Sequence, residues 1–487
     1  MSNKYIKLSA NQQQFSNSLN HIDFTIPQGY TVDLSKSKLL INCQPGLTQP
    51  TAGADDDGLA SVFEVAMAVV DDAAVPIAPA SSAVLVKNCA MRSQKVGVIE
   101  SLRRVDTLRS ALANYSKDVD EKRSLYLNGL NGPISAGGSK ASPFVNYVKT
   151  GTTLSTQITE SNVSIPLHEC MDVCSATSYS TDRYGSTSLH FEMNFDKLQI
   201  VSLNTKEADG VVPVLDASEY GDFTTLTAAG DGTAITAAVS DKATNNPESD
   251  FPFYTGQRVL ITCTINGGAA TKSRRIASIT YSSTTGLSTI NFATIGTLAN
   301  TQTCVFTSIA PAPTTAPTYT ISNCELELKL TDEDPPAEIQ YATYSTEEDS
   351  FTAVGTKVKM YQVEPEADNL LVAVTNGDIY ADSIPTGYRF RVDNIEQSRG
   401  KVVTASRGEH QDNINKLFLN MDLELKDISE KALSQLKSVN KTNDAAFSMG
   451  LIGVPLPVTS NQKNVNLEID SAAMSELILY KRMVKSI

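Results

Sequence analysis

The sequence lacks several residues on which common biochemical functions depend. Its 487 residues contain no Trp and four His, and charged residues make up 19%, below the usual share of about 25%. The absence of Trp disfavours sugar-binding domains, because these use indole rings as stacking platforms. Four His leave little material for acid–base or metal chemistry. The formal charge of −14 disfavours bulk nucleic-acid binding, since Lys and Arg drive phosphate binding.

Long apolar runs and a cysteine framework are missing as well. The longest early apolar run, Val65–Val70, is far shorter than the roughly 18 residues of a membrane span. Residues 1–7 lack the apolar core of a signal peptide, so we expect synthesis inside a cell without secretion through such a peptide. The seven Cys are an odd number and widely scattered, which favours reduced core residues over disulfides.

What the sequence does contain is period-two alternation. Apolar and polar residues alternate through Leu189–Phe195, Cys324–Leu330 and Tyr388–Val392, which is typical of strands with one buried face. Leu370–Val374 is apolar throughout and fits a strand buried on both faces. Many short strands separated by Gly, Pro and Asn predict an all-β sandwich or barrel.

Two segments show helical spacing instead. Apolar residues recur at intervals of three and four through Val98–Tyr115, which predicts an amphipathic helix with Glu100 and Arg109 on its polar face. A second helical segment is expected from about Asn415 to Lys437. Capping-box spacing at 427–430 leaves open whether this segment is one helix or two.

The middle of the chain differs sharply in composition. No Asp or Glu occurs from Phe251 to Asn323, and 19 of the 48 residues from Thr271 to Thr318 are Ser or Thr. Turn signals at Asn266–Gly268 and Thr285–Gly286 predict a small antiparallel meander. The Pro-rich stretch Pro311–Pro317 predicts a stiff linker after it.

These shifts divide the chain into two strand-rich bodies and one insertion. Without the insertion, Leu189–Val201 and Ile321–Leu330 become consecutive strands, and we expect them to share one sheet. No residue-level repeat relates the two bodies. The expected bounds are 1–204 for the first body, completed by 319–335, then 205–318 for the inserted β-rich segment and 336–487 for the second body.

No motif points firmly to chemistry, so we predict no catalytic, cofactor-binding or metal residues. Gly132–Lys140 resembles a phosphate loop, but a Gly stands where Lys should follow the second Gly. Asp55–Gly58 lacks the alternate acids and the later Glu of a calcium loop. His168, Cys170 and Cys174 are spaced for one helical turn, with no second ligand pair to complete a zinc site. A short buried helix between strands is the favoured interpretation there, with a metal site or a Cys–His nucleophile as alternatives.

Basic residues gather at both ends of the chain. Ordinary solvated termini explain them most simply, and a weak contact with nucleic acid or lipid is the alternative. The residues are Lys4, Lys7, Lys481, Arg482 and Lys485.

The order of four stretches resembles the double jelly-roll major capsid proteins of virophages, polinton-like viruses and related double-stranded DNA viruses. The resemblance rests on order, spacing and β character over nearly the whole chain. The stretches are Val84–Ser93 with Ile99–Arg104, then Ile165–Leu167 with Asp182–Gly185 and Leu189–Phe195, then Tyr388–Asn394, and finally Asn466–Asp470 with Leu477–Lys481.

This resemblance implies two eight-stranded antiparallel jelly rolls in tandem, with short helical insertions. Three copies would form a homotrimer, a pseudo-hexagonal capsomer of an icosahedral virion, with the 205–318 insertion as an outward tower. The implied partners are neighbouring capsomers and minor capsid, penton or cement proteins. Contact with the genome or an internal membrane at the inner face, and with a host receptor at the tower, stays open. The resemblance implies assembly inside the host cell and no cofactor.

Three other functions remain as alternatives at this point. The first is a minor capsid protein at the vertex, a penton or spike with a single roll. The second is a host-attachment adhesin acting through residues 205–318, where Arg258, Arg274 and Arg275 would meet anionic glycans. The third is a β-sandwich hydrolase that uses His168 or His190.

Overall fold

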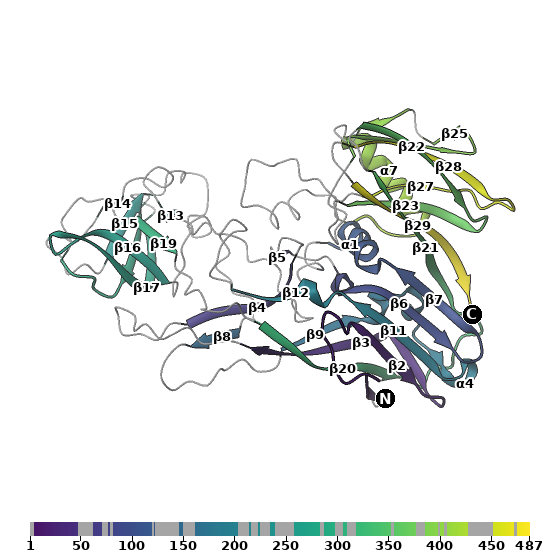
Figure 1. The fold of residues 1–487 in the computed structure, drawn as a ribbon, viewed down its shortest axis with the longest axis horizontal. Helices are drawn as coiled ribbons and strands as arrows, with labels where there is room; N and C mark the ends of the chain where they lie inside the picture. The colour runs from purple at the N-terminus through teal and green to yellow at the C-terminus, as the bar shows by residue number, and fades with distance from the viewer. Residues whose placement is uncertain are drawn as a thin grey trace.

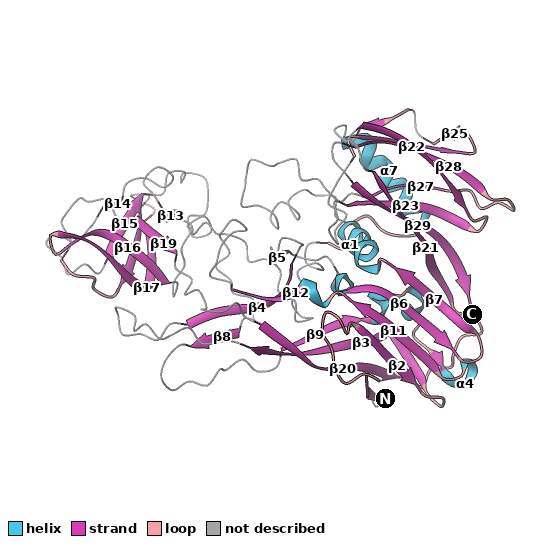
Figure 2. Ribbon diagram, viewed as in Figure 1, coloured by secondary structure: helices cyan, strands magenta, loops and turns pink. Residues whose placement is uncertain are grey.

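Strands dominate the computed structural model of the protein (Figure 2). The residues that the structure describes are 4–46, 62–70, 76–77, 81–118, 121, 146–149, 161–202, 214–215, 223–224, 234–238, 258–282, 287–297, 305–308, 318–351, 355–375, 385–397, 400–403, 407–426, 451–471 and 475–487.

Two antiparallel sheets form the first body, which we call roll 1 (Figure 1). One sheet has the order β1-β20-β3-β10, with β9 also paired to β3, and the other has the order β2-β11-β6-β7. The bounds are β1 Tyr5–Ser9, β2 His21–Ile26, β3 Thr31–Gly46, β6 Val86–Ser93, β7 Gly97–Arg103, β9 Ser161–Pro166, β10 Tyr179–Ser180, β11 Thr187–Met193 and β20 Thr318–Leu330.

Two further antiparallel sheets form the second body, roll 2. Their orders are β21-β29-β23-β27 and β22-β28-β24-β25, with β26 also paired to β24. The bounds are β21 Gln340–Phe351, β22 Gly355–Val363, β23 Ala367–Thr375, β24 Gly387–Val392, β25 Ile395–Glu396, β26 Val402–Val403, β27 Leu451–Pro455, β28 Lys463–Ser471 and β29 Ser475–Ser486.

Both rolls have the same topology. In each roll we number eight strands from one to eight along the chain, and both rolls then have the sheet orders 1-8-3-6 and 2-7-4-5. The numbered strands are β1, β2, β3, β6, β7, β9, β11 and β20 in roll 1, and β21 to β25 and β27 to β29 in roll 2. This is the double-sheet arrangement of a jelly roll. The predicted fold class, two jelly rolls in tandem, is therefore confirmed.

The expectation that Leu189–Val201 and Ile321–Leu330 share a sheet is wrong. β11 lies between β2 and β6, whereas β20 lies between β1 and β3 in the facing sheet. The seventh and eighth strands of a jelly roll run in opposite sheets, so their closeness in sequence does not make them neighbours.

Alternating side chains explain where the cores lie. β11 buries Leu189, Phe191 and Met193 and turns its polar residues outward, as its alternation predicts. β23 is buried on both faces, because Leu370 packs in the interior of roll 2 while Leu371 belongs to a second cluster shared with roll 1. The continuous apolar run of β23 thus marks a sheet that is covered on both sides.

The insertion forms a separate antiparallel sheet. Its order is β13-β19-β16-β17-β18-β15-β14, and it lies far from both chain termini (Figure 1). The predicted turn at Asn266–Gly268 is confirmed, since Asn266 and Gly267 have φ angles of 52° and 81° between β16 and β17, as a type I′ hairpin requires. The bounds are β13 Val214–Leu215, β14 Phe223–Thr224, β15 Ala234–Ala238, β16 Arg258–Ile265, β17 Gly268–Ser282, β18 Leu287–Phe292 and β19 Val305–Ser308.

A small sheet lies on the way from roll 1 to the insertion (Figure 1). It has the order β12-β4-β5, with β8 also paired to β4, and β12 contacts β20. The two chain segments that enter and leave the insertion therefore run side by side. The bounds are β4 Val62–Val70, β5 Pro76–Ile77, β8 Asn146–Lys149 and β12 Leu198–Ser202.

Both predicted helices need correction. Residues Gly97–Arg103 form strand β7, and the helix α1 covers only Val105–Ser116. The helix α7 spans Arg407–Asn420, so it begins earlier than expected and stops before Lys437. Asp422 in the left-handed region (φ 55°) is incompatible with further helix there. Positions 427–437 lie outside the described residues. Among the described residues, no helix is long and apolar enough to cross a membrane.

Candidate assembly interface

Roll 2 packs one sheet face against the flank of roll 1. In this contact β21 lies against β7, and β23 of the same sheet lies against α1. Because β7 is the last strand of its sheet, the backbone groups on its free side need other partners. Three hydroxyl groups of roll 2 donate to carbonyl oxygens at this edge: Tyr341 to Ile99 (2.7 Å), Thr346 to Arg103 (3.3 Å) and Tyr480 to Arg104 (2.8 Å).

Aromatic side chains fill the rest of this contact. The guanidinium of Arg109 lies 5.9 Å from the ring centroid of Tyr344. Tyr115 of α1 and Phe418 of α7 have ring centroids 5.5 Å apart. Buried residues of both rolls form one continuous hydrophobic cluster, so the contact resembles a domain core and is expected to be permanent.

Three ionisable residues lie together near the contact: Glu100 is buried, and Arg109 and Asp172 are half-buried. Arg109 Nη1 donates to Asp172 Oδ1 at 3.0 Å, and the Val173 N–H donates to Glu100 Oε2 at 3.0 Å. Burial, together with the charge of Asp172, raises the pKa of Glu100 to about 8, so Glu100 is protonated at neutral pH. Burial would lower the pKa of Arg109, but the charge of Asp172 outweighs it and the pKa is raised. The cluster thus contains one cation and one anion.

The sequence places Glu100 on the polar face of a helix, and this is wrong, whereas Arg109 does lie on helix α1. Glu100 lies on β7 and is 1% exposed, because its side chain points into roll 1 on the same face as Met91, its partner on β6. No pattern within residues 98–115 could have shown that Val173, 73 residues later, would donate to this carboxyl group. Tyr341 and Tyr480, which make the matching contacts, were missed for the same reason.

The contact joins two different surfaces, and the counterpart of each has exposed side chains among the described residues. Roll 1 uses its fifth strand, β7, whereas roll 2 uses its first and eighth strands, β21 and β29. The fifth strand of roll 2 is β25, and the first and eighth strands of roll 1 are β1 and β20. Such a head-to-tail contact can be repeated between molecules, unlike a contact of two identical surfaces.

The outer face of β1 and β20 is polar. Lys7 Nζ lies 3.3 Å from Glu325 Oε2, and Lys38 of β3 lies 3.2 Å from Glu327. Tyr5 is the large apolar group on this face and is 49% exposed. This face therefore combines a ladder of ion pairs with one exposed ring.

The free edge of roll 2 is more apolar. Ile395 of β25 and Val403 of β26 are 68% and 47% exposed, and both strands pair with β24. Arg391, opposite Glu396 in the ladder, is exposed as well. An edge with exposed branched side chains is a typical place for a further contact.

One polar arrangement on roll 1 has the order of a catalytic triad. Ser188 Oγ lies 3.0 Å from His190 Nε2, whose Nδ1 lies 2.5 Å from Asp23 Oδ1. β11 is paired on both sides, with β2 and with β6, so its backbone N–H groups already have partners and cannot form an oxyanion hole. β11 itself therefore supplies none of the transition-state stabilisation that such a set of residues needs.

His168, Cys170 and Cys174 do not converge on one point. Cys170 and Cys174 are fully buried, whereas His168 is exposed. Burial raises the pKa of both thiols, which opposes the thiolate that metal binding and nucleophilic attack require. Helix α3 (Leu167–Cys170) confirms the predicted short helix between strands. No group of His, Cys, Asp and Glu among the described residues could hold a metal ion.

The basic residues near the C-terminus are already engaged. Lys481 Nζ donates to the Gln362 carbonyl at 2.8 Å, and Arg482 pairs with Asp368. Lys4 and Lys485 are exposed. The five basic residues therefore do not form one uniform patch.

Two other candidate features give little support to ligand binding. Arg274 in the insertion is buried, and its Nε donates to the Ala293 carbonyl at 3.0 Å, so it is not free to meet a glycan. Arg258 and Arg275 are opposite each other in the ladder, and their side chains are not described. The loops 55–58 and 132–140 lie outside the described residues.

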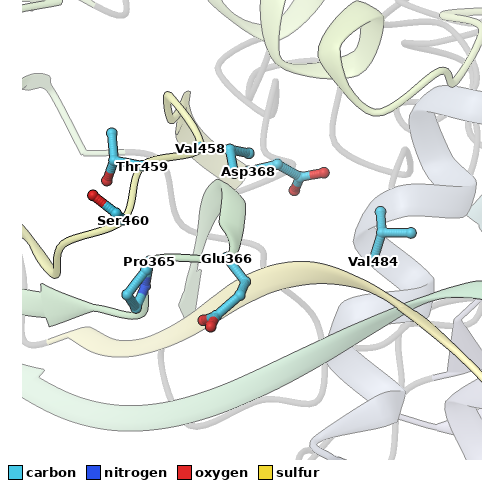
Figure 3. A pocket seen from close by; sticks show the side chains of 7 residues that line it. All are labelled: Pro365, Glu366, Asp368, Val458, Thr459, Ser460 and Val484. Carbon is cyan, nitrogen blue, oxygen red and sulfur yellow. The ribbon is translucent and has the colours of Figure 1, made fainter.

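A pocket of about 380 Å³ opens near the C-terminus of roll 2 (Figure 3). The turn between β22 and β23 forms one wall, and Lys463 supports this turn by donating to the Pro365 and Ala367 carbonyls at 2.9 and 2.7 Å. No His or Cys is among the described residues that line it. The lining consists of Pro365, Glu366, Asp368, Val458, Thr459, Ser460 and Val484.

No family model matches the sequence, and no curated protein matches it. Solved structures are similar over nearly the whole chain. A chain of the Sputnik virophage structure has 8% identity and a TM-score of 0.40, covering 100% of this chain and 87% of its own length. The mavirus major capsid protein has 9% identity and a TM-score of 0.37, with 99% and 86% covered. The major capsid protein P2 from bacteriophage PM2 has 7% identity and a TM-score of 0.28, with 99% and 98% covered.

Proposed function

We propose that the chain is a major capsid protein, a structural subunit without enzymatic activity that builds an icosahedral virus shell. The observation that carries this proposal is the pair of jelly rolls with identical strand order, joined head-to-tail by a core-like contact. Jelly rolls are a common building unit of viral capsids. Two rolls in one chain allow three chains to supply six similar units around one axis.

The capsomer is a homotrimer with pseudo-hexagonal outline in this proposal. The first roll comprises residues 1–204 completed by 319–335, the second comprises 336–487, and 205–318 is an outward tower. The termini and the insertion lie at opposite ends of the molecule (Figure 1), as expected if one end faces the shell interior. Interfaces of such permanent assemblies bury of the order of 2,000–5,000 Å².

The proposal places the protein in the virion, with neighbouring capsomers and minor capsid, penton or cement proteins as partners. The genome or an internal membrane would meet the inner face, and a host receptor would meet the tower. A minor vertex protein with one roll is the weaker alternative, because this chain has two. An adhesin acting through the tower is compatible with the capsid role, although Arg274 is unavailable for it.

Mass measurement and electron microscopy of the purified chain test the proposal. Light scattering behind size exclusion is expected to give three times the mass of the chain, and negative-stain images are expected to show hexagonal outlines. A chain that remains monomeric at every concentration and ionic strength tried would contradict the proposal. Pentamers would instead favour the vertex alternative.

A further inference from the structure

We propose that His410 makes the docking of helix α7 sensitive to acid, so that acidic conditions release α7 and open the contact between the two rolls. The acid response is a property of the folded chain itself. Its use, the opening of a virus shell in an acidic compartment, rests on the proposed function. Among the four His of the chain, all of which the structure describes, His410 is the one that is buried.

His410 belongs to a hydrogen-bonded group at the start of α7. Asn413 Nδ2 donates to Oη of Tyr388 on β24 at 3.1 Å. The hydroxyl hydrogen of Tyr388 is therefore left to donate to Nδ1 of His410, 2.9 Å away. The other ring nitrogen, Nε2, is buried without a hydrogen-bond partner among the described residues. With Nδ1 accepting and Nε2 carrying the hydrogen, the ring is a neutral imidazole.

No charged side chain among the described residues offsets the burial of His410. α7 packs on β23, β26 and β27 and meets α1 through Phe418, while Tyr388 belongs to β24. β26 and β27 consist of uncharged residues. Tyr115 and Tyr388 stay neutral in acid, because burial raises the pKa of both phenols. The charged side chains described on the remaining elements are exposed or paired elsewhere: Glu409, Asp412 and Lys416 of α7, Asp106 and Arg109 of α1, Asp368 of β23, Arg389 and Arg391 of β24, and Lys401 beside β26.

Protonation of His410 works against this arrangement. An imidazolium donates from both ring nitrogens, so Nδ1 would compete with Asn413 for the oxygen of Tyr388, and the hydroxyl hydrogen would lose its acceptor. Burial lowers the pKa of His410 to about 4, whereas a His that release of α7 exposes titrates at about 6.5. Between these values the released state holds a proton that the docked state lacks, so docking weakens as the pH falls. The equilibrium constant for release rises by up to about tenfold per pH unit in this window.

α7 connects this group to the contact between the rolls. Ile414, Leu417 and Phe418 lie in the hydrophobic cluster that both rolls share. The ring of Phe418 also meets Tyr115 of α1. The fit beneath the helix is close, because a methyl group added to Gly453 of β27 would lie 2.7 Å from Cδ2 of Leu417. Closely packed interiors transmit a displacement to their neighbours, so release of the first turn of α7 removes apolar cover from the contact between the rolls.

Hydrogen exchange of the α7 amides in the intact chain, at several pH values from about 5 to about 7, tests the proposal. Each rate is divided by the intrinsic rate at the same pH, so that the ratio reports the equilibrium constant for release. For the wild type we expect this constant to rise roughly twentyfold from about pH 7 to about pH 5. His410→Asn should lose most of this rise, because its amide oxygen can accept from Tyr388 but its side chain cannot take up a proton. A loss of helix stability that is the same at every pH cancels in this comparison.

His168→Asn is the matched control. His168 is exposed on α3 of roll 1, so its replacement should leave the rise in α7 release as large as in the wild type. His410→Gln supplies a second neutral side chain at position 410 if His410→Asn does not fold. An equal rise in the wild type and in a folded His410 variant would overturn the proposal. A wild-type release constant that does not change over this pH range would overturn it as well.

Light scattering on the same samples separates this inference from the proposed function. Trimers at neutral pH whose α7 stays protected at about pH 5 refute the acid response alone. A chain that releases α7 in acid but remains monomeric at every pH supports the acid response of His410. The same result refutes the proposed function, and with it the use of this response in a virus shell.

Discussion

Glu100 is a carboxyl group that folding removes almost completely from water. It lies on β7 between Asp172 and Arg109 and beneath Tyr341 of roll 2, with the thiols of Cys89 and Cys174 as further titratable neighbours. Its Oε1 has no hydrogen-bond partner among the described residues. Such a group is better tolerated as a neutral acid than as an anion.

The pH dependence of stability should therefore change in Glu100→Gln. The folded pKa is about 8, whereas an unfolded Glu titrates near 4.3. Between these values the folded state holds a proton that the unfolded state has released, so stability falls as pH rises through this window. The slope from this group is at most about 1.4 kcal/mol per pH unit. Urea unfolding of both proteins at several pH values from 5 to 8 measures it, and identical slopes would contradict the prediction.

Tyr341 shows what a single hydroxyl contributes at the contact between the rolls. Tyr341→Phe keeps the ring but leaves the Ile99 carbonyl on β7 without its donor. We expect a loss of about 1–3 kcal/mol in the free energy of unfolding, the usual cost of an unsatisfied buried group. Tyr5→Phe, which alters an exposed ring, serves as the control and should change stability by less than about 0.5 kcal/mol. Equal effects of the two substitutions would rule out the assigned role of Tyr341.

At the scale of elements, strands with one polar face could be predicted well from the sequence. β11, β20 and β24 alternate because one side faces a core and the other faces water, and β23 is apolar throughout because its sheet is covered twice. β7 could not be predicted as a strand, because a register shift opposite Met91 and Arg92 of β6 interrupts its alternation. Ile99, Glu100 and Leu102 are all buried, and this spacing of buried residues resembles that of a helix.

The side chains that meet on the surface could not be predicted from the sequence either. The sequence predicted no catalytic or metal residues, and the described structure contains a triad-like set on one sheet that no periodicity had indicated. Ser188 and His190 are two apart on β11, and Asp23 comes from β2. The interface residues are similarly contributed by distant segments. Local patterns specify which face of an element is buried, but pairing between distant elements decides what meets that face.

The β16–β17 turn allows an element-level prediction with a close control. Gly267 has φ 81°, and a methyl group added to its Cα would meet only open space, whereas its neighbour Gly268 has the same open space without a positive φ. Gly267→Ala should therefore destabilise the hairpin by about 1–2 kcal/mol through backbone strain alone. Gly268→Ala should have a much smaller effect. Hydrogen exchange of amides in β16 and β17 measures both, and equal exchange rates in the two variants would contradict the assignment of the turn.

At the scale of the whole molecule, the two rolls are one cooperative body and the insertion is another. The core of roll 1 continues across the contact into β21, β23 and α7. Buried residues of the insertion, such as Ile261, Ile276 and Ile290, belong to neither roll cluster. The insertion should thus be separable from the rolls, whereas the rolls should not be separable from each other.

Deleting the insertion tests this division. The chain leaves roll 1 through β12 and returns through β20, and these two strands are in contact, so a short Gly/Ser linker between Ser202 and Thr318 can replace the residues between them. Closing a flexible loop costs little when its ends are close. We expect the shortened chain to unfold in one transition, with a midpoint within a few degrees of the full chain, and to form the same oligomer.

A chain cut instead between residues 335 and 336 should yield two fragments that are insoluble when separated, because each fragment exposes its half of the shared hydrophobic cluster. Two outcomes would contradict this division of the molecule. One is that the two rolls fold independently of each other, and the other is that deleting the insertion abolishes cooperative unfolding.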